Sequence, residues 1–166
     1  MAESLAMFFV NAFNGLSKEV IIFIISLMPI LELRGGLIAA SLLNVDLLQA
    51  FIICFVGNIF PVPFILLFIE KLFNWLKKFK KSKKVVEKLE KKTLAKRSQI
   101  DKYGYWGIFI FVAIPLPGTG AWTGALLAML LGMEKKKSFL AITVGVMVAG
   151  IIMSIFSYGV LGNLIR

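Results

Sequence analysis

Four apolar stretches follow one another along the chain, and their pattern predicts an all-α integral membrane protein. Residues 47–69 carry no charge over 23 positions, and residues 138–165 carry none over 28 positions. A helix rises about 1.5 Å per residue, so each of these unbroken stretches is long enough to cross a bilayer. We therefore expect each of them to form one transmembrane helix.

The other two stretches, residues 20–45 and 103–133, are interrupted near their middle. The interrupting residues are Pro29, Gly35 and Gly36 in the first stretch and Pro115, Pro117, Gly118 and Gly120 in the second. Backbone groups freed by such breaks cannot face hydrocarbon, so the breaks must line a polar cavity or lie inside the protein. The pieces on either side are about half a bilayer long. We expect each stretch to form a re-entrant helical hairpin.

The two halves of the chain also resemble each other. After a shift of 88 positions, residues 35–69 align with residues 123–157 and share eight identities over 35 positions, among them Gly36 with Gly124. Each half is an interrupted stretch, a short acidic turn and an unbroken span. One full crossing per half inverts the second copy, as in many secondary transporters. We predict two inverted repeats, each a re-entrant hairpin plus one transmembrane helix; the alternative is a plain four-span helical bundle.

The whole chain is interpreted as a single membrane domain, residues 1–166. Its parts are an interfacial helix at 1–19, a first repeat at 20–69, a basic cytoplasmic linker at 70–102 and a second repeat at 103–166. The linker holds 13 of the 19 Lys and Arg residues, and such residues collect on the cytoplasmic side of membranes. Its apolar residues recur at helical spacing, which is typical of an amphipathic helix on the membrane surface. A solvated loop that only sets the topology explains the charge equally well.

Composition narrows the function classes. The chain is 59% hydrophobic with a net charge of +10, has no histidine and has one cysteine, Cys54. These counts exclude His-based catalytic triads and disulfides within the chain, and they argue against zinc sites. No motif holds a pair of carboxylates, so we expect no enzyme, no cofactor and no metal site. The positive charge lies in one block between apolar runs, which indicates membrane topology rather than nucleic-acid binding.

Glu32 and Arg34, in the first break, are the leading candidates for a binding site. A charge at the bilayer centre costs roughly 2.5–3.5 kcal/mol on insertion scales, so charged residues there usually have a function. Glu32 could bind and release a proton, because burial favours the neutral form of a carboxyl group. Arg34 could hold an anion such as a phosphate or a carboxylate. The alternative is that the two charges merely neutralise each other near an interface.

The second break holds polar groups without charge. Thr119, Thr123 and the indole N–H of Trp122 can donate hydrogen bonds to a ligand or to unwound backbone. A half-helix that begins near Ala121 would point its positive end at the midplane, which suits an anion. Small residues spaced four apart explain the same segment by close helix packing. Asn58, in the first unbroken span, is expected to face the interior as a structural hydrogen-bonding residue.

The run PILELRGG at residues 29–36, followed by PLPGTGAWTGALLA at residues 115–128, resembles the small multidrug export protein family. That family is similar to the DedA membrane proteins, whose re-entrant hairpins carry acidic and arginine residues. The resemblance covers roughly residues 20–165 and implies a multi-pass transporter of the prokaryotic cytoplasmic (inner) membrane. In the DedA proteins the implied cargo is a polyprenyl-phosphate lipid carrier. Glu32 matches their acidic group, but they place arginines in the second hairpin, whereas Arg34 lies in the first.

We therefore predict a transporter that moves a small or amphipathic substrate, anionic lipid phosphates included, across the membrane or between its leaflets. Proton coupling through Glu32 is the accompanying hypothesis. The alternatives are an uncoupled lipid flippase or scramblase and a non-transporting membrane scaffold. The expected partners are membrane lipid and a small-molecule or lipid substrate, and no nucleic acid. Glycine-rich ridges suit a homodimer and equally suit contact between the two hairpins of one chain.

Overall fold

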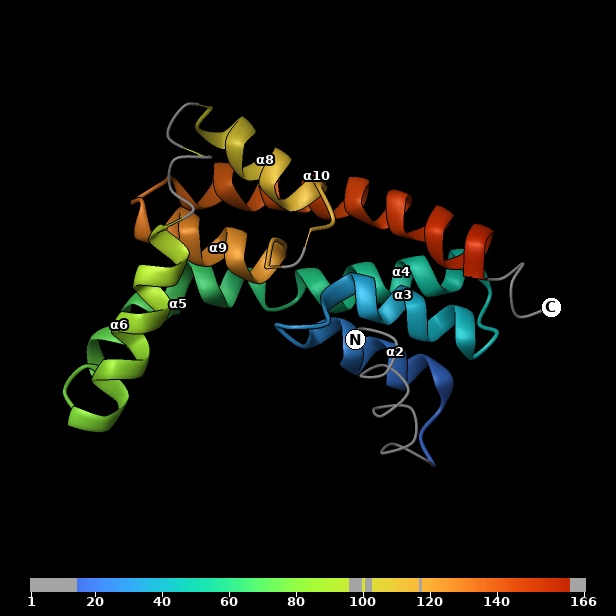
Figure 1. The fold of residues 1–166 in the computed structure, drawn as a ribbon, viewed down its shortest axis with the longest axis horizontal. Coiled ribbons are helices and arrows are strands. Elements are labelled where there is room, and N and C mark those ends of the chain that lie inside the picture. Colours follow the sequence, from blue (N-terminus) through green and yellow to red (C-terminus); the bar gives the residue numbers. More distant parts are fainter. Residues whose placement is uncertain (1–14, 96–99, 101–102, 117, 162–166) are drawn as a thin grey trace.

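The computed structural model of the protein describes residues 15–95, 100, 103–116 and 118–161. All its regular elements in these residues are helices, in agreement with the predicted all-α class (Figure 1). Most of the predicted interfacial helix at residues 1–19 lies outside the described residues, as does Pro117.

Two long apolar rods run through the molecule (Figure 1). The first consists of α4 (Leu47–Ile59) and α5 (Val62–Leu76), and the second begins with α10 (Lys135–Ser154) and continues into the π-helical segment η1 (Ile155–Leu161). Within the described residues, these are the two helices long and apolar enough to cross a membrane, over Leu47–Leu76 and Lys135–Gly159. Both stretches that were predicted to cross the membrane therefore form helices of sufficient length and apolar character.

The first rod differs from the unbroken helix predicted for residues 47–69. It bends between Ile59 and Val62, and it continues to Leu76, into the region assigned to the linker. The bend has a local cause, because Pro61 and Pro63 have no backbone N–H with which to continue the helical hydrogen-bond ladder. The prediction of one unbroken helix rested on hydropathy, which measures apolar character and does not detect such an interruption.

The two interrupted stretches form short helices. They are α2 (Lys18–Leu27) and α3 (Glu32–Leu42) in the first stretch, and α8 (Tyr105–Ala113) and α9 (Ala121–Leu130) in the second. With 9 to 11 residues each, these helices are about 14–17 Å long, half the thickness of a hydrocarbon core. Helices α2 and α3 pack on α4, while α8 and α9 pack on α10.

The first break is shorter than predicted. The α3 helix already begins at Glu32, so Gly35 and Gly36 lie inside a helix and the prediction that they break the backbone is wrong. Their role is close packing, since a Cβ atom on Gly36 would lie 1.9 Å from Ser26 Oγ of α2 and 2.8 Å from Cys54 Sγ of α4. The second half-helix begins at Ala121, as predicted.

The same type of turn follows the second helix of each pair, α3 and α9. Asn44 after α3 and Gly132 after α9 have φ angles of 52° and 66°. The next N–H in each turn, from Val45 or Met133, donates to a carbonyl five residues back, at 3.0 and 2.9 Å. Both helices therefore end in a Schellman-type cap. Asn44 and Gly132 are 88 positions apart, the offset that aligns the two halves of the sequence.

The basic linker folds as a separate helix, α6 (Lys80–Leu94), which excludes a fully irregular loop over those residues. Its Val86 and Thr93 are buried, and the helix packs on α9 and α5. An ion pair of 2.7 Å between Lys77 and Glu90 joins the end of the first rod to α6. The apolar residues of the linker therefore do not form one continuous face, because the chain turns between Leu76 and Lys80.

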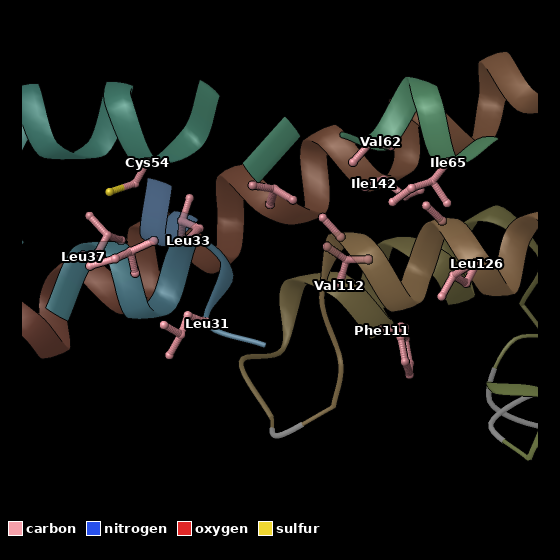
Figure 2. Packing of buried hydrophobic residues seen from close by; sticks show 14 of the residues in the cluster. Leu31, Leu33, Leu37, Cys54, Val62, Ile65, Phe111, Val112, Leu126 and Ile142 are labelled. Atoms are coloured by element: carbon pink, nitrogen blue, oxygen red, sulfur yellow. The ribbon is translucent and has the colours of Figure 1, made fainter. Parts of the chain in front are cut away.

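The core consists of two groups of side chains on either side of the hairpin breaks. Figure 2 shows Leu33, Leu37 and Cys54 between α3 and α4. A second group between α5, α9 and α10 includes Val62, Ile65, Leu126 and Ile142. Many large apolar side chains on the outer faces of the rods are exposed, among them Ile52, Phe64, Phe68, Leu140 and Ile151. This distribution is that of a helical protein whose outer surface faces lipid.

We expect Gly57→Ala and Gly145→Ala each to reduce the free energy of unfolding by about 1–3 kcal/mol, the usual cost of overpacking. A Cβ atom at these positions would lie 2.9 Å from the carbonyl oxygen of Phe23 and 3.0 Å from that of Phe109. Helix backbone cannot yield as a side chain does. Thermal unfolding in detergent measures the loss, with Gly159→Ala as control because no atom lies within 4 Å of its Cβ position. Equal melting temperatures for all three variants would contradict the packing.

Candidate functional site

Glu32 connects the two hairpins. It is the first residue of α3 and has a φ angle of 52°, in the left-handed region. Its side chain is 5% exposed, and its two carboxylate oxygens accept the backbone N–H groups of Ala121 and Trp122, both at 3.2 Å. These are among the first amides of α9, which have no partner within their own helix. A residue of the first hairpin therefore caps a helix of the second, where the helix dipole favours negative charge.

Gly120 makes this cap possible. A Cβ atom at this position would lie 1.9 Å from Glu32 Oε2, and the φ angle of 137° is one that residues with side chains rarely adopt. The glycine therefore leaves space for the carboxylate and allows the chain to turn into α9. Gly120, one of the predicted break residues, stands directly before α9 as its N-cap, and the structure adds this second role.

Arg34 bonds to the broken backbone of the second hairpin. Its guanidinium donates to the carbonyl of Leu116, to the carbonyl of Thr119 at 3.1 Å and to the hydroxyl of Thr119 at 2.9 Å. The Thr119 hydroxyl also lies 2.8 Å from the carbonyl of Ile114. The carbonyls that the break between α8 and α9 removes from helical hydrogen bonding thus find donors inside the protein, as the membrane interior requires.

Trp122 provides a bond in the opposite direction. Its indole N–H donates to the carbonyl of Leu27, the last residue of α2, at 3.2 Å. Each hairpin therefore donates a side-chain hydrogen bond to the backbone at the break of the other. The ion pairs found among the described residues do not join Glu32 to Arg34; each of the two side chains bonds instead to the second hairpin.

We call the contact that Glu32, Arg34 and Trp122 make between the two hairpins the hairpin junction. A cleft of about 400 Å³ opens beside it. Glu32, Arg34, Thr119 and Thr123 line it, whereas Trp122 does not. Thr119, Thr123 and Leu126 follow one face of the second break and α9, so the cleft extends about 10 Å along that helix. Pro29 and Gly118, two of the predicted break residues, are also in its wall.

The cleft is also lined by three residues of α6, which are Leu89, Lys92 and Thr93. Sequence reasoning assigned these residues to a surface helix and did not connect them with the site. A weak signal exists, because Val86 and Thr93 are seven residues apart and therefore share one face of a helix. Both are buried. The many lysines around them give this segment a strongly polar composition, so composition alone does not indicate a buried face.

The two apolar spans agree with the comparison to known protein families. The family described as putative small multi-drug export protein matches residues 32–152, a range that begins at Glu32 and extends into α10. The chain belongs to this family. No curated protein and no solved structure matches it. Membership of this family, together with two apolar spans, assigns the chain to a membrane and is consistent with a transporter rather than an enzyme.

We expect Arg34→Lys to reduce the free energy of unfolding by about 2 kcal/mol, because one ammonium group cannot reproduce a guanidinium fork and leaves a carbonyl of the break without a donor. Thr119→Val should cause a smaller loss, since it removes the hydroxyl that bonds to Arg34 and to the carbonyl of Ile114 but leaves in place the bonds that Arg34 itself donates to backbone carbonyls. Thermal unfolding in detergent measures both, and Lys84→Arg at an exposed position of α6 is the matched control. A melting temperature for Arg34→Lys equal to that of the control would show that the fork does not support the hairpin.

Proposed function

We propose that this family member moves its substrate through the cleft at the hairpin junction and that a proton bound to Glu32 changes the conformation of that junction. The observation that carries the proposal is the double position of Glu32, which caps α9 and also lines the cleft. A change in the protonation of this carboxyl group therefore acts on the contact between the hairpins and on the site at the same time.

The architecture we propose is two inverted repeats whose hairpins re-enter the membrane from opposite faces and meet near the midplane. Four short helices of half-bilayer length support it, as do the equivalent caps at Asn44 and Gly132. Figure 1 shows the beginnings of α3 and α9 near the middle of the two rods, with α6 and the first turn of α10 at the same end of the molecule. That end would be cytoplasmic, because Lys and Arg gather there.

The proposed coupling follows from the hydrogen bonds of the carboxyl group. An ionised carboxylate only accepts, and both of its oxygens are bonded to N–H groups of α9. A proton converts one oxygen into a donor that faces an N–H group, and it removes the negative charge that the helix N-terminus favours. The protonated state would therefore prefer an arrangement in which Glu32 has left α9. A proton can drive transport only through such a difference in affinity between two states.

The composition of the cleft supports an amphipathic substrate with an anionic group. Arg34 and Lys92 contribute positive charge, the threonines contribute hydroxyl groups, and Ile30, Leu89 and Leu126 contribute apolar surface. Its volume is within the range of small-molecule sites in proteins. Arg34 already bonds to the second break, so an anion would share this residue with the backbone instead of holding it alone.

We expect Glu32→Gln to abolish proton-coupled transport while the protein still folds. Glutamine retains an acceptor oxygen for one amide of α9 but cannot ionise. In proteoliposomes that contain a pH-sensitive dye, a panel of amphipathic anions should cause proton movement with the wild type and none with the variant. Glu70→Gln, at an exposed position of α5, is the matched control for the loss of one negative charge. Normal proton movement with Glu32→Gln would show that the coupling group is elsewhere. Substrate movement that persists without proton movement would favour an uncoupled flippase.

The inverted architecture predicts the sidedness of three exposed positions. In a Cys54→Ser background, Lys84→Cys in α6 and Lys136→Cys at the start of α10 should react with an impermeant thiol reagent from the cytoplasmic side. Gln49→Cys at the start of α4 should react from the other side. All three residues are exposed, whereas the nearby Ser138 is fully buried and unsuitable. Labelling of Lys136→Cys from the side opposite to Lys84→Cys would instead establish four full crossings.

A further inference from the structure

A second, much smaller cavity lies at the hairpin junction; it shares Glu32 and Arg34 with the cleft but none of the residues of α6. Its volume is about 10 Å³, and its wall includes Glu32, Arg34, Asn58 and the backbone at Gly120 and Ala121. A cavity of about 10–15 Å³ by this measure holds a single water molecule. In a space of that size, every polar group in the wall is close to the one molecule that can occupy it.

Asn58 lines this cavity and has an unused hydrogen-bonding group. The residue lies near the end of α4, just before the bend, and is 3% exposed. Its side-chain oxygen is buried and accepts no hydrogen bond from the described residues. A buried amide oxygen without a partner has lost its hydration and gained no hydrogen bond in exchange, which destabilises the folded state. A water molecule that donates to this oxygen would remove most of that cost.

Glu32 has the capacity to bind the same water molecule. A carboxylate offers about four acceptor sites, and the amides of Ala121 and Trp122 use one on each oxygen. A water molecule in the cavity can donate one hydrogen to Asn58 and the other to Glu32, while its own oxygen accepts from the Arg34 guanidinium. It would then have three polar partners, which is typical of buried water.

We propose that the cavity between α3, α4 and α9 binds one ordered water molecule that links the Asn58 amide to the Glu32 carboxylate. Asn58 is then a positioning residue, because it holds Glu32 through the water and does not touch the substrate cleft. The link also connects the hairpin junction to the bend of the first rod. Its relevance to transport rests on the proposed function, whereas the water site itself does not.

The test is the replacement of the amide by an apolar side chain of similar size, in the full-length protein in detergent. Asn58→Leu would fill the cavity, expel the water and leave Glu32 with one donor fewer. We expect the melting temperature to fall by about 3 °C, the shift that corresponds to roughly 1 kcal/mol in a chain of this length. An unpartnered Asn58 predicts the opposite sign, because leucine would relieve a buried unsatisfied group. A melting temperature that rises or does not change therefore overturns the proposal.

A second measurement reports on Glu32 itself. The infrared carboxyl band that disappears in Glu32→Gln identifies this residue, and we expect Asn58→Leu to shift the band. Asn74→Leu, at an exposed position of α5, is the matched control and should leave the band in place. A band unchanged by Asn58→Leu would also overturn the proposal. If Asn58→Leu fails to fold, the melting temperature and the infrared band are measured with Asn58→Val instead. Neither readout involves transport, so a normal proton flux in Glu32→Gln would contradict the proposed function without affecting this result.

Discussion

Breaks in helices inside a membrane leave backbone amides and carbonyls without hydrogen-bond partners, because neither lipid nor bulk water can supply them. At the hairpin junction, two side chains supply these hydrogen bonds. Glu32 accepts two amides at the start of α9, and Arg34 donates to carbonyls of the loop before it. Both partners lie more than 80 residues away along the chain. The second hairpin therefore obtains the hydrogen bonds of its break from the first, and each hairpin depends on the other for its conformation.

The magnitudes explain why charged residues are tolerated in this place. A single charge in the bilayer centre costs roughly 2.5–3.5 kcal/mol on insertion scales, and each buried backbone group without a partner costs about 1–3 kcal/mol. Arg34 satisfies several carbonyls at once, so the gain is of the same order as the cost of its burial. A neutral side chain with one donor could not do the same. The arrangement also keeps an ionisable carboxyl group beside an open cleft, where a proton could change the contact between the hairpins.

The two proposed repeats use equivalent positions in different ways. Position 32 is a glutamate and position 120, 88 residues later, is the glycine that makes room for it. Arg34 and Trp122, also 88 positions apart, each donate from a half-helix to the backbone at the break of the other hairpin. The geometry is shared, but the ionisable acid is in the first half. An inward-open and an outward-open conformation, related by exchange of the two repeats, would therefore differ in free energy. We propose that protonation of Glu32 changes this difference in free energy.

The sequence by itself determined the elements whose cause is local. Apolar length predicted the two spans, proline and glycine predicted the breaks, and the cost of charge in lipid identified Glu32 and Arg34. Prediction from local sequence failed where one residue type occurs in two kinds of structure, since glycine can break a helix or allow close packing within one, and proline can interrupt a helix that is otherwise apolar. Gly35 and Gly36 lie within α3, where Gly36 allows close helix packing, and Pro61 bends a stretch that hydropathy alone presents as continuous.

Only the tertiary structure decided which groups meet. Periodicity reports which face of a helix is apolar, but it carries no information on a partner 80 or 90 residues away. The amides that bind Glu32, the carbonyls that bind Arg34 and the place of Lys92 in the cleft depend on how separate helices pack. The same holds for Asn58, whose burial was predicted from its polar character in a span, and whose neighbours in the cavity became known only from the fold.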